Sequence, residues 1–310
     1  MSNSTLTILL YHGVTRSQAI GLENISGKHI QAEEYFNQMQ WLKNNAYVIS
    51  MEEVYEIITK KKKFPKKAVA VTFDDGFENN FTEAFPVIVD LEIPTTFYIS
   101  SAMIGTQNMF WVDQLEDCIN NSKLDAIEIY LDDKRQFNVK LIEDKIKALS
   151  VIKSFCKSSS NLTKENVIKQ VVSQTKHNPN YKNSDNYRVM NWSQLYEMSL
   201  NKNIIIGGHS LSHEILSKLS IEDMRINIEL SIKKLEMNLD RKIEHYSYPE
   251  GQEDHYNEEV IKALKDSGIK CCPSAIHGIN HNGEDLFNLK RIMVGFGDIT
   301  FPSDSILSIN

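Results

Sequence analysis

The sequence lacks a long apolar run, a charged leader and a framework of paired cysteines. No apolar run approaches the roughly 18 residues that a membrane-spanning helix requires. The first ten residues contain no lysine or arginine, and the apolar stretch at 6–11 is too short for the core of a signal peptide. These absences predict a cytoplasmic protein without a membrane span.

Cysteine is scarce, and the few cysteines present do not form a recognisable pattern. They are Cys118, Cys156, Cys271 and Cys272, and no Cys-x-x-Cys pair occurs. Vicinal cysteines rarely pair with each other, and four in 310 residues do not make a disulfide framework. We therefore expect reduced packing residues and no structural zinc site built from cysteine.

Basic residues are also in deficit, because 34 Lys and Arg face 41 Asp and Glu, giving a net charge of −7. Such a chain has no general attraction to nucleic acid, so none is expected as a partner. The densest basic segment, 60–67, holds six lysines in eight residues. It fits a solvated helix end, where lysine complements the helix dipole. Contact with an anionic polymer or membrane surface is the alternative.

Apolar runs alternate with helical patterns along the chain. A capping-box pair, Ser50 and Glu53, predicts a helix from about 51 to 61, and Ser220 with Asp223 opens another. The run at 68–73 is nearly all apolar, as in a strand covered on both faces. Other predicted strands are 6–11, 95–99, 203–206, 243–248, 268–272 and 289–294. This alternation predicts an α/β fold with a parallel sheet, open or closed into a barrel.

The segment 105–187 has a different character, being rich in Lys, Asp, Asn and Ser without strong strand signals. We expect a mostly helical insertion there, with the role of a lid or cap. Length alone allows about two domains, but a single α/β barrel can exceed about 200 residues. One barrel over 1–310 with this insertion is the predicted organisation.

Polar motifs follow several predicted strands. Asp74 and Asp75 come directly after the strand at 68–73, and parallel α/β folds carry their active sites at such strand ends. Adjacent carboxylates repel each other unless they share a cation or a proton. An ordinary Asp-Asp-Gly turn is the alternative interpretation.

A histidine pair, His209 and His213, follows the strand at 203–206 and Gly207-Gly208. Histidines at i and i+4 of a helical turn face the same way and can bind one metal ion, and the glycines would let the backbone turn sharply. His277 and His281 repeat the spacing in a loop-like stretch, where the signal is weaker.

Two further strand ends offer candidate groups. His12 closes the first strand and is either a candidate proton donor or a core histidine. Tyr248, Pro249 and Glu250 end another strand. They form either a plain turn or a rigid loop whose backbone N–H groups face an oxyanion. Proline has no N–H, so a neighbour such as Glu250 would be the donor.

Together these residues supply one carboxylate and two imidazoles for a metal ion, with a carboxylate and an imidazole to spare. A set of two histidines and one carboxylate with open positions suits zinc, cobalt or non-haem iron. The spare carboxylate suggests a general base for water, which favours hydrolysis over oxygen chemistry.

With these motifs, the sequence resembles the polysaccharide deacetylase family, also called the NodB-homology or carbohydrate esterase family. Residues 72–76 match its first motif without change, 209–213 match the second, and 247–251 look like a degenerate third. The similarity covers roughly 1–104 and 188–295. It implies a distorted (β/α) barrel with about seven parallel strands.

The resemblance also implies roles. Asp74 would be the general base, and Asp75, His209 and His213 would bind one divalent ion, zinc in the first place, with cobalt, nickel or manganese as alternatives. The Tyr-His-Gly-Val start resembles the branch that includes poly-N-acetylglucosamine deacetylases, in which a first-strand histidine is the general acid. That role falls to His12.

The third motif departs from the family pattern. Ser247 stands where the family usually has an arginine, and Glu250 stands where it has an aromatic residue. Arg291, from the last strand, could orient the base instead. Glu250 adds a negative charge near the substrate.

The implied reaction is removal of the acetyl group from an N-acetylated sugar, with release of acetate. The alternatives are hydrolysis of a non-sugar amide and a pseudoenzyme that binds saccharide without turnover. A cytoplasmic enzyme would act on a sugar nucleotide, a lipid-linked precursor or a small amino sugar. Phe110, Trp111 and Trp192 are candidates for stacking on sugar rings, with core packing as the alternative.

Overall fold

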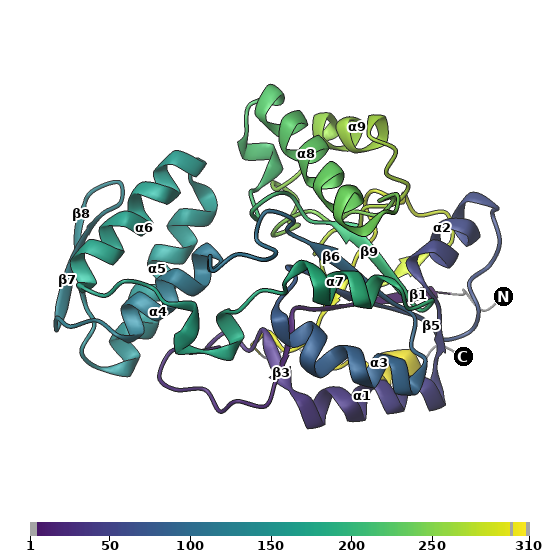
Figure 1. Ribbon diagram of the computed structural model, residues 1–310, viewed down its shortest axis with the longest axis horizontal. Coiled ribbons are helices and arrows are strands. Elements are labelled where there is room, and N and C mark those ends of the chain that lie inside the picture. The colour runs from purple at the N-terminus through teal and green to yellow at the C-terminus, as the bar shows by residue number, and fades with distance from the viewer. Residues whose placement is uncertain (1–4, 298–299, 308–310) are drawn as a thin grey trace. The chain divides into compact units, whose positions relative to one another are not determined.

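The computed structural model describes residues 5–297 and 300–307 (Figure 1). The chain divides into two compact units. The barrel unit comprises Met1–Arg16, Ser26–Thr106 and Val189–Asn310, and the second unit comprises Ser17–Ile25 and Gln107–Arg188. None of the described helices combines the length and the apolar character needed to cross a membrane.

A seven-stranded sheet forms the centre of the barrel unit. Its main path runs in the order β10, β1, β5, β6, β9, while β4 pairs with β5 and β11 pairs with β1. All pairings are parallel except that of β10 with β1. The strands are β1 (Thr5–Tyr11), β4 (Tyr47–Val48), β5 (Ala68–Phe73), β6 (Thr95–Ile99), β9 (Ile204–Gly208), β10 (Asn280–His281) and β11 (Ile292–Met293).

Beyond β9 the sheet continues through single bridges instead of full strands. Gly208 pairs with Tyr246, and His245 pairs with Cys271, both in parallel. The N–H of Cys272 donates to the carbonyl of Leu286 at 2.9 Å. The chain then reaches β11, which lies against β1. The predicted fold, a distorted (β/α) barrel, is confirmed, but the continuous strands expected at 243–248 and 268–272 are wrong, and β11 is shorter than the predicted 289–294.

Helices cover the sheet on both sides, with α8 and α9 opposite α1 and α3 (Figure 1). Both predicted helix starts are confirmed, because Ser50 and Glu53 form a capping box and the Ser220 hydroxyl accepts from the Asp223 N–H. Lys60–Lys63 follow the end of α2 and are exposed. The helices are α1 (Ala32–Asn45), α2 (Met51–Thr59), α3 (Phe85–Leu91), α7 (Trp192–Ser199), α8 (Ile221–Leu239), α9 (Glu258–Asp266) and α10 (Ser303–Leu307).

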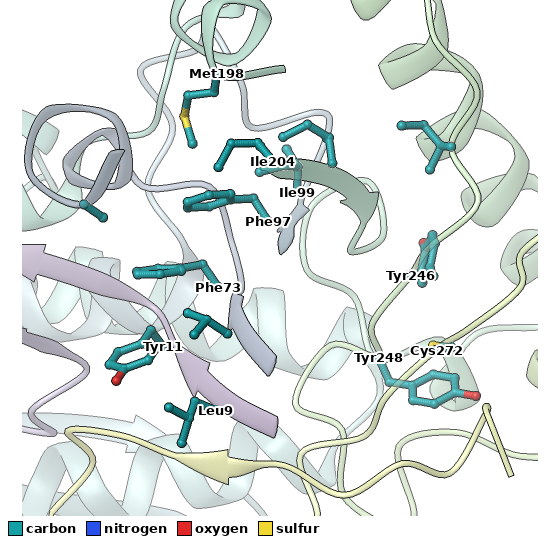
Figure 2. Close-up of a cluster of buried hydrophobic side chains, with 14 of the residues drawn as sticks. Leu9, Tyr11, Phe73, Phe97, Ile99, Met198, Ile204, Tyr246, Tyr248 and Cys272 are labelled. Carbon is teal, nitrogen blue, oxygen red and sulfur yellow. The ribbon is translucent and has the colours of Figure 1, made fainter. Parts of the chain in front are cut away.

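Aromatic side chains from neighbouring strands stack in the core (Figure 2). The ring of Phe73 lies 5.2 Å from that of Tyr11 and 4.9 Å from that of Phe97. These residues end β1 and β5 and lie within β6, so their packing fixes the relative positions of three strand ends. All four cysteines are free and buried, as predicted.

The second unit has its own apolar core, which includes Leu115, Ile152 and Val171. Its strands β7 and β8 form an antiparallel hairpin that the sequence analysis did not predict. Trp111 packs in this core and Phe110 is also buried, so the two rings are packing residues. The elements are α4 (Trp111–Asn120), β7 (Ala126–Tyr130), β8 (Lys134–Asn138), α5 (Ile142–Ser158) and α6 (Asn161–Thr175).

Candidate active site

Three parallel strands of the sheet, β1, β5 and β9, bring the predicted site residues together, with β6 lying between β5 and β9. His12 follows β1, Asp74 and Asp75 follow β5, and His209 follows β9. The Asp74 N–H donates to the Tyr11 carbonyl at 3.0 Å, which ties the first two strand ends. Asp75 has a φ of 80°, a conformation that is costly for a residue with a Cβ and that concentrates at functional sites.

Asp75, His209 and His213 form a group that could hold a metal ion, with one ligand atom from each lying within 4.8 Å of the others. The Nε2 atoms of His209 and His213 lie 3.5 and 3.4 Å from Oδ1 of Asp75. Nδ1 of His209 lies 2.9 Å from the carbonyl oxygen of Ser247, so it carries the proton and leaves Nε2 free to bind a cation. Two imidazole nitrogens and a carboxylate oxygen fit a divalent transition metal.

His209 and His213 are brought together by a non-helical turn, whereas we expected a turn of helix. Ser210 and His213 have φ values of 61° and 63°. The turn is held by the Tyr246 hydroxyl, which accepts from the Ser210 N–H at 2.7 Å, and by Asn227, whose side-chain oxygen accepts from the Leu211 N–H at 3.1 Å.

Gly207 and Gly208 do not form the sharp turn that we inferred. Both lie within β9, and neither has a positive φ. A Cβ on Gly207 would lie 2.6 Å from Tyr98, and one on Gly208 would lie 2.5 Å from Tyr246. The glycines are required because two tyrosine rings occupy the space of their side chains.

Asp74 is paired with Arg291. The two terminal guanidinium nitrogens lie 2.8 Å from the two carboxylate oxygens. Burial alone would raise the pKa of Asp74, but the charge of Arg291 and its hydrogen bonds lower it to about 2. The carboxylate is therefore ionised at neutral pH. Arg291 itself is held by the Ser274 carbonyl at 2.6 Å.

Ser247 is a further site residue, and in the sequence it is visible only as a departure from the family pattern. Its hydroxyl donates to Oδ1 of Asp74 at 3.2 Å and lies 2.7 Å from Nδ1 of His209. The substitution of a small hydroxyl residue for an arginine was the only sequence signal, and it did not indicate which groups the hydroxyl contacts.

His12 lies near the charged groups of the site. Burial lowers its pKa to about 3, the charge of Asp74 opposes this shift, and the charge of Lys28 adds to it. Its ring packs edge-on against Phe296, with 4.9 Å between centroids. Nδ1 of His12 has no hydrogen-bond partner in the described part of the chain.

The expected oxyanion loop forms a tight turn, with φ values of 61° at Glu250 and 59° at Gly251. The side chain of Tyr248 is not available to a substrate, because it is fully buried, stacks on Tyr256 and donates to the Phe287 carbonyl at 3.0 Å. A role of this loop toward an oxyanion would therefore rest on its backbone N–H groups.

The second histidine pair does not form a comparable group. His277 pairs with Arg291 in a bridge, and His281 lies in β10 opposite Thr5. Within the described residues, neither belongs to a group of three metal-type ligands.

A family model of polysaccharide deacetylases matches residues 61–272. The chain belongs to the polysaccharide deacetylase family. The resemblance inferred from the motifs at Asp74 and His209 is thereby confirmed.

Curated relatives match over part of their length. A poly-beta-1,6-N-acetyl-D-glucosamine N-deacetylase of Staphylococcus epidermidis is 31% identical over 115 residues, which cover 34% of this chain and 39% of that protein. One of Staphylococcus aureus is 28% identical over 137 residues, covering 41% of this chain and 44% of that protein. The chain thus spans less than half the length of these polysaccharide deacetylases.

Solved structures share the fold of this deacetylase family member. IcaB from Ammonifex degensii superposes with a TM-score of 0.64 at 16% identity, covering 100% of this chain and 99% of that one. The Streptococcus pyogenes deacetylase PplD in complex with acetate has a TM-score of 0.63 at 15% identity, covering 99% of each chain.

Proposed function

We propose that this protein is a metal-dependent carbohydrate N-deacetylase that removes the acetyl group from an N-acetylated saccharide. The observation that carries the proposal is the group of Asp75, His209 and His213 beside an Asp74 that is ionised and held by Arg291. Membership of the polysaccharide deacetylase family supports it. The names of the staphylococcal relatives favour a substrate that contains N-acetylglucosamine.

The site residues would have separate roles in metal binding and proton transfer. Asp75, His209 and His213 would hold one divalent ion, zinc in the first place, which supplies Lewis-acid chemistry for an amide carbonyl and its attacking water. Asp74 accepts the proton of the attacking water, because its carboxylate is ionised and cannot rotate.

His12 would protonate the leaving amine nitrogen as the C–N bond breaks. Because burial lowers its pKa to about 3, His12 is neutral before the reaction, so it would first receive the proton that Asp74 removes from water and then pass it to the nitrogen. The turn at 249–251 would offer the backbone N–H of Glu250 to the developing oxyanion. Arg291 would orient the base through its two hydrogen bonds to the carboxylate.

The proposal is tested by metal content and acetate release measured on the same preparations. Elemental analysis after dialysis against zinc should find about one equivalent in the wild type and little in His209→Ala. Wild-type protein should then release acetate from N-acetylglucosamine oligomers, and His209→Ala should not. A wild type that binds no zinc, cobalt or nickel when each is supplied would overturn the metal-hydrolase interpretation.

A further inference from the structure

Ser247 lies at the point where the proposed base and a proposed metal ligand meet. The residue is fully buried, and its N–H donates to the Gly208 carbonyl at 3.0 Å, which fixes its backbone. The hydroxyl therefore has little freedom, and its two polar neighbours are Oδ1 of Asp74 and Nδ1 of His209.

The hydrogens around this hydroxyl can be arranged in one consistent way. An ionised carboxylate only accepts, so the single hydroxyl hydrogen of Ser247 goes to Oδ1 of Asp74. The hydroxyl oxygen then accepts from Nδ1–H of His209, which it shares with the Ser247 carbonyl at 2.9 Å. The imidazole is thereby held in the tautomer whose Nε2 is unprotonated.

The same arrangement distinguishes the two oxygens of Asp74. Oδ1 accepts from Arg291 and from Ser247. Oδ2 accepts only from Arg291 among the described residues and lies 3.9 Å from Nε2 of His209. Oδ2 therefore keeps accepting capacity on the side of the histidine nitrogen.

We propose that Ser247 is a positioning residue whose hydroxyl couples the base to the metal ligand, directing Nε2 of His209 toward the metal and leaving Oδ2 of Asp74 as the oxygen that accepts the proton. This role rests on the proposed deacetylase function. It also explains why a serine can replace the arginine of the family motif, because Arg291 already provides the positive charge beside Asp74.

The test compares Ser247→Ala with Ser247→Thr, which keeps a hydroxyl. Ser199→Ala is the matched control, because Ser199 is also buried and its hydroxyl donates to a backbone carbonyl, that of Tyr196, at 2.7 Å. For each protein, thermal unfolding checks the fold, and competition with a chromophoric chelator gives the zinc affinity without any substrate.

Ser247→Ala should weaken zinc binding about tenfold, a loss typical of residues that orient a ligating histidine. Its kcat for acetate release should fall about tenfold or more while KM stays within about twofold. Ser247→Thr should restore both values, and Ser199→Ala should change neither.

An unchanged zinc affinity in Ser247→Ala would overturn the proposal, whatever happens to turnover. Failure of Ser247→Thr to restore zinc affinity, in a protein with wild-type thermal stability, would overturn it as well. If the wild type released no acetate from any saccharide, the deacetylase function would fail, yet the zinc measurement would still test the coupling of Ser247 to His209.

Discussion

Arg291 and Asp74 form a buried, two-pronged ion pair, with 2.8 Å between each terminal guanidinium nitrogen and one carboxylate oxygen. The residues are 217 positions apart in the sequence, and the pair links the residue before β11 to the end of β5, the two strands that pair with β1. Such a fork fixes both the position and the rotation of the carboxylate. The proposed base is thus oriented by an arginine from the last part of the barrel.

Removing the arginine alone should destabilise the protein. Arg291→Met leaves the buried Asp74 charge without a partner, which typically costs about 3–5 kcal/mol of unfolding free energy. Adding Asp74→Asn to Arg291→Met should recover part of that loss, because it removes the stranded charge. Urea denaturation of the wild type, both single variants and the double variant measures the coupling. Strictly additive losses would contradict the buried-pair interpretation.

Variants of Asp74 and His213 should differ in their effects, because the first should lose turnover alone and the second should lose turnover and metal binding. Asp74→Asn keeps the three proposed ligands, so it should retain zinc, while kcat should fall by about 10²–10⁴-fold because the general base is lost. His213→Ala removes a proposed ligand and should lose both zinc and turnover. Zinc content and acetate release in matched samples decide this, with thermal unfolding as the check on folding. Near-normal turnover in Asp74→Asn would show that the base is another group.

Acidification should destabilise the metal-free protein. Burial lowers the pKa of His12 to about 3 and holds that of His29 well below its usual value of 6.5. The unfolded chain binds a proton at each of these positions below about pH 6.5, while the folded chain does not. The free energy of unfolding should therefore fall as the pH decreases from about 6.5, by up to about 2 kcal/mol per histidine at pH 5.

The measurement is urea denaturation at about pH 7, 6 and 5 in the presence of a chelator, so that metal release does not contribute. Asp74 does not change the stability between about pH 7 and 5. Its pKa is lowered from 3.8 to about 2, so the stability that it contributes is lost only below about pH 3.8. His29→Gln should reduce the slope of unfolding free energy against pH, because about one proton fewer is taken up on unfolding. A stability that stays constant over the range would contradict the assignment of neutral buried histidines.

Local sequence signals identified the elements that position the site. The strand Ala68–Phe73 was predicted with its observed ends, because six consecutive buried residues leave a continuous apolar run. The caps at Ser50 and Ser220 were visible because side-chain capping depends on residues three positions apart. Because β5 and β9 both pair in parallel with β6, Asp75 and His209 follow strand ends at the same edge of the sheet.

Contacts that depend on tertiary register could not be predicted in the same way. The contacts of the Ser247 hydroxyl require the positions of two other strand ends, and no local pattern contains them. The turn at 209–213 was misinterpreted because its spacing also fits a helix, whereas Tyr246 and Asn227 stabilise a different backbone. The hairpin in the second unit was missed because buried Ile127 and Ile129 alternate with charged and exposed residues over a short run.

The close contact between Gly208 and Tyr246 should make the metal site sensitive to a single methyl group. A Cβ on Gly208 would lie 2.5 Å from the Tyr246 ring, whose hydroxyl is held by the Ser210 N–H at 2.7 Å and by Ser231 at 3.0 Å. Because the ring cannot move without releasing the turn after His209, Gly208→Ala should cost about 1–3 kcal/mol of stability. It should also weaken zinc binding.

Gly268→Ala is the matched comparison for Gly208→Ala. Gly268 has a φ of 84°, and nothing lies within 4 Å of the position that its Cβ would take. The substitution should therefore cost about 1–2 kcal/mol through backbone strain alone. Its zinc affinity should equal that of the wild type, because the added methyl group would touch nothing within 4 Å. Equal zinc affinity in both alanine variants, measured by chelator competition, would show that the Tyr246 ring does not transmit the clash to His209.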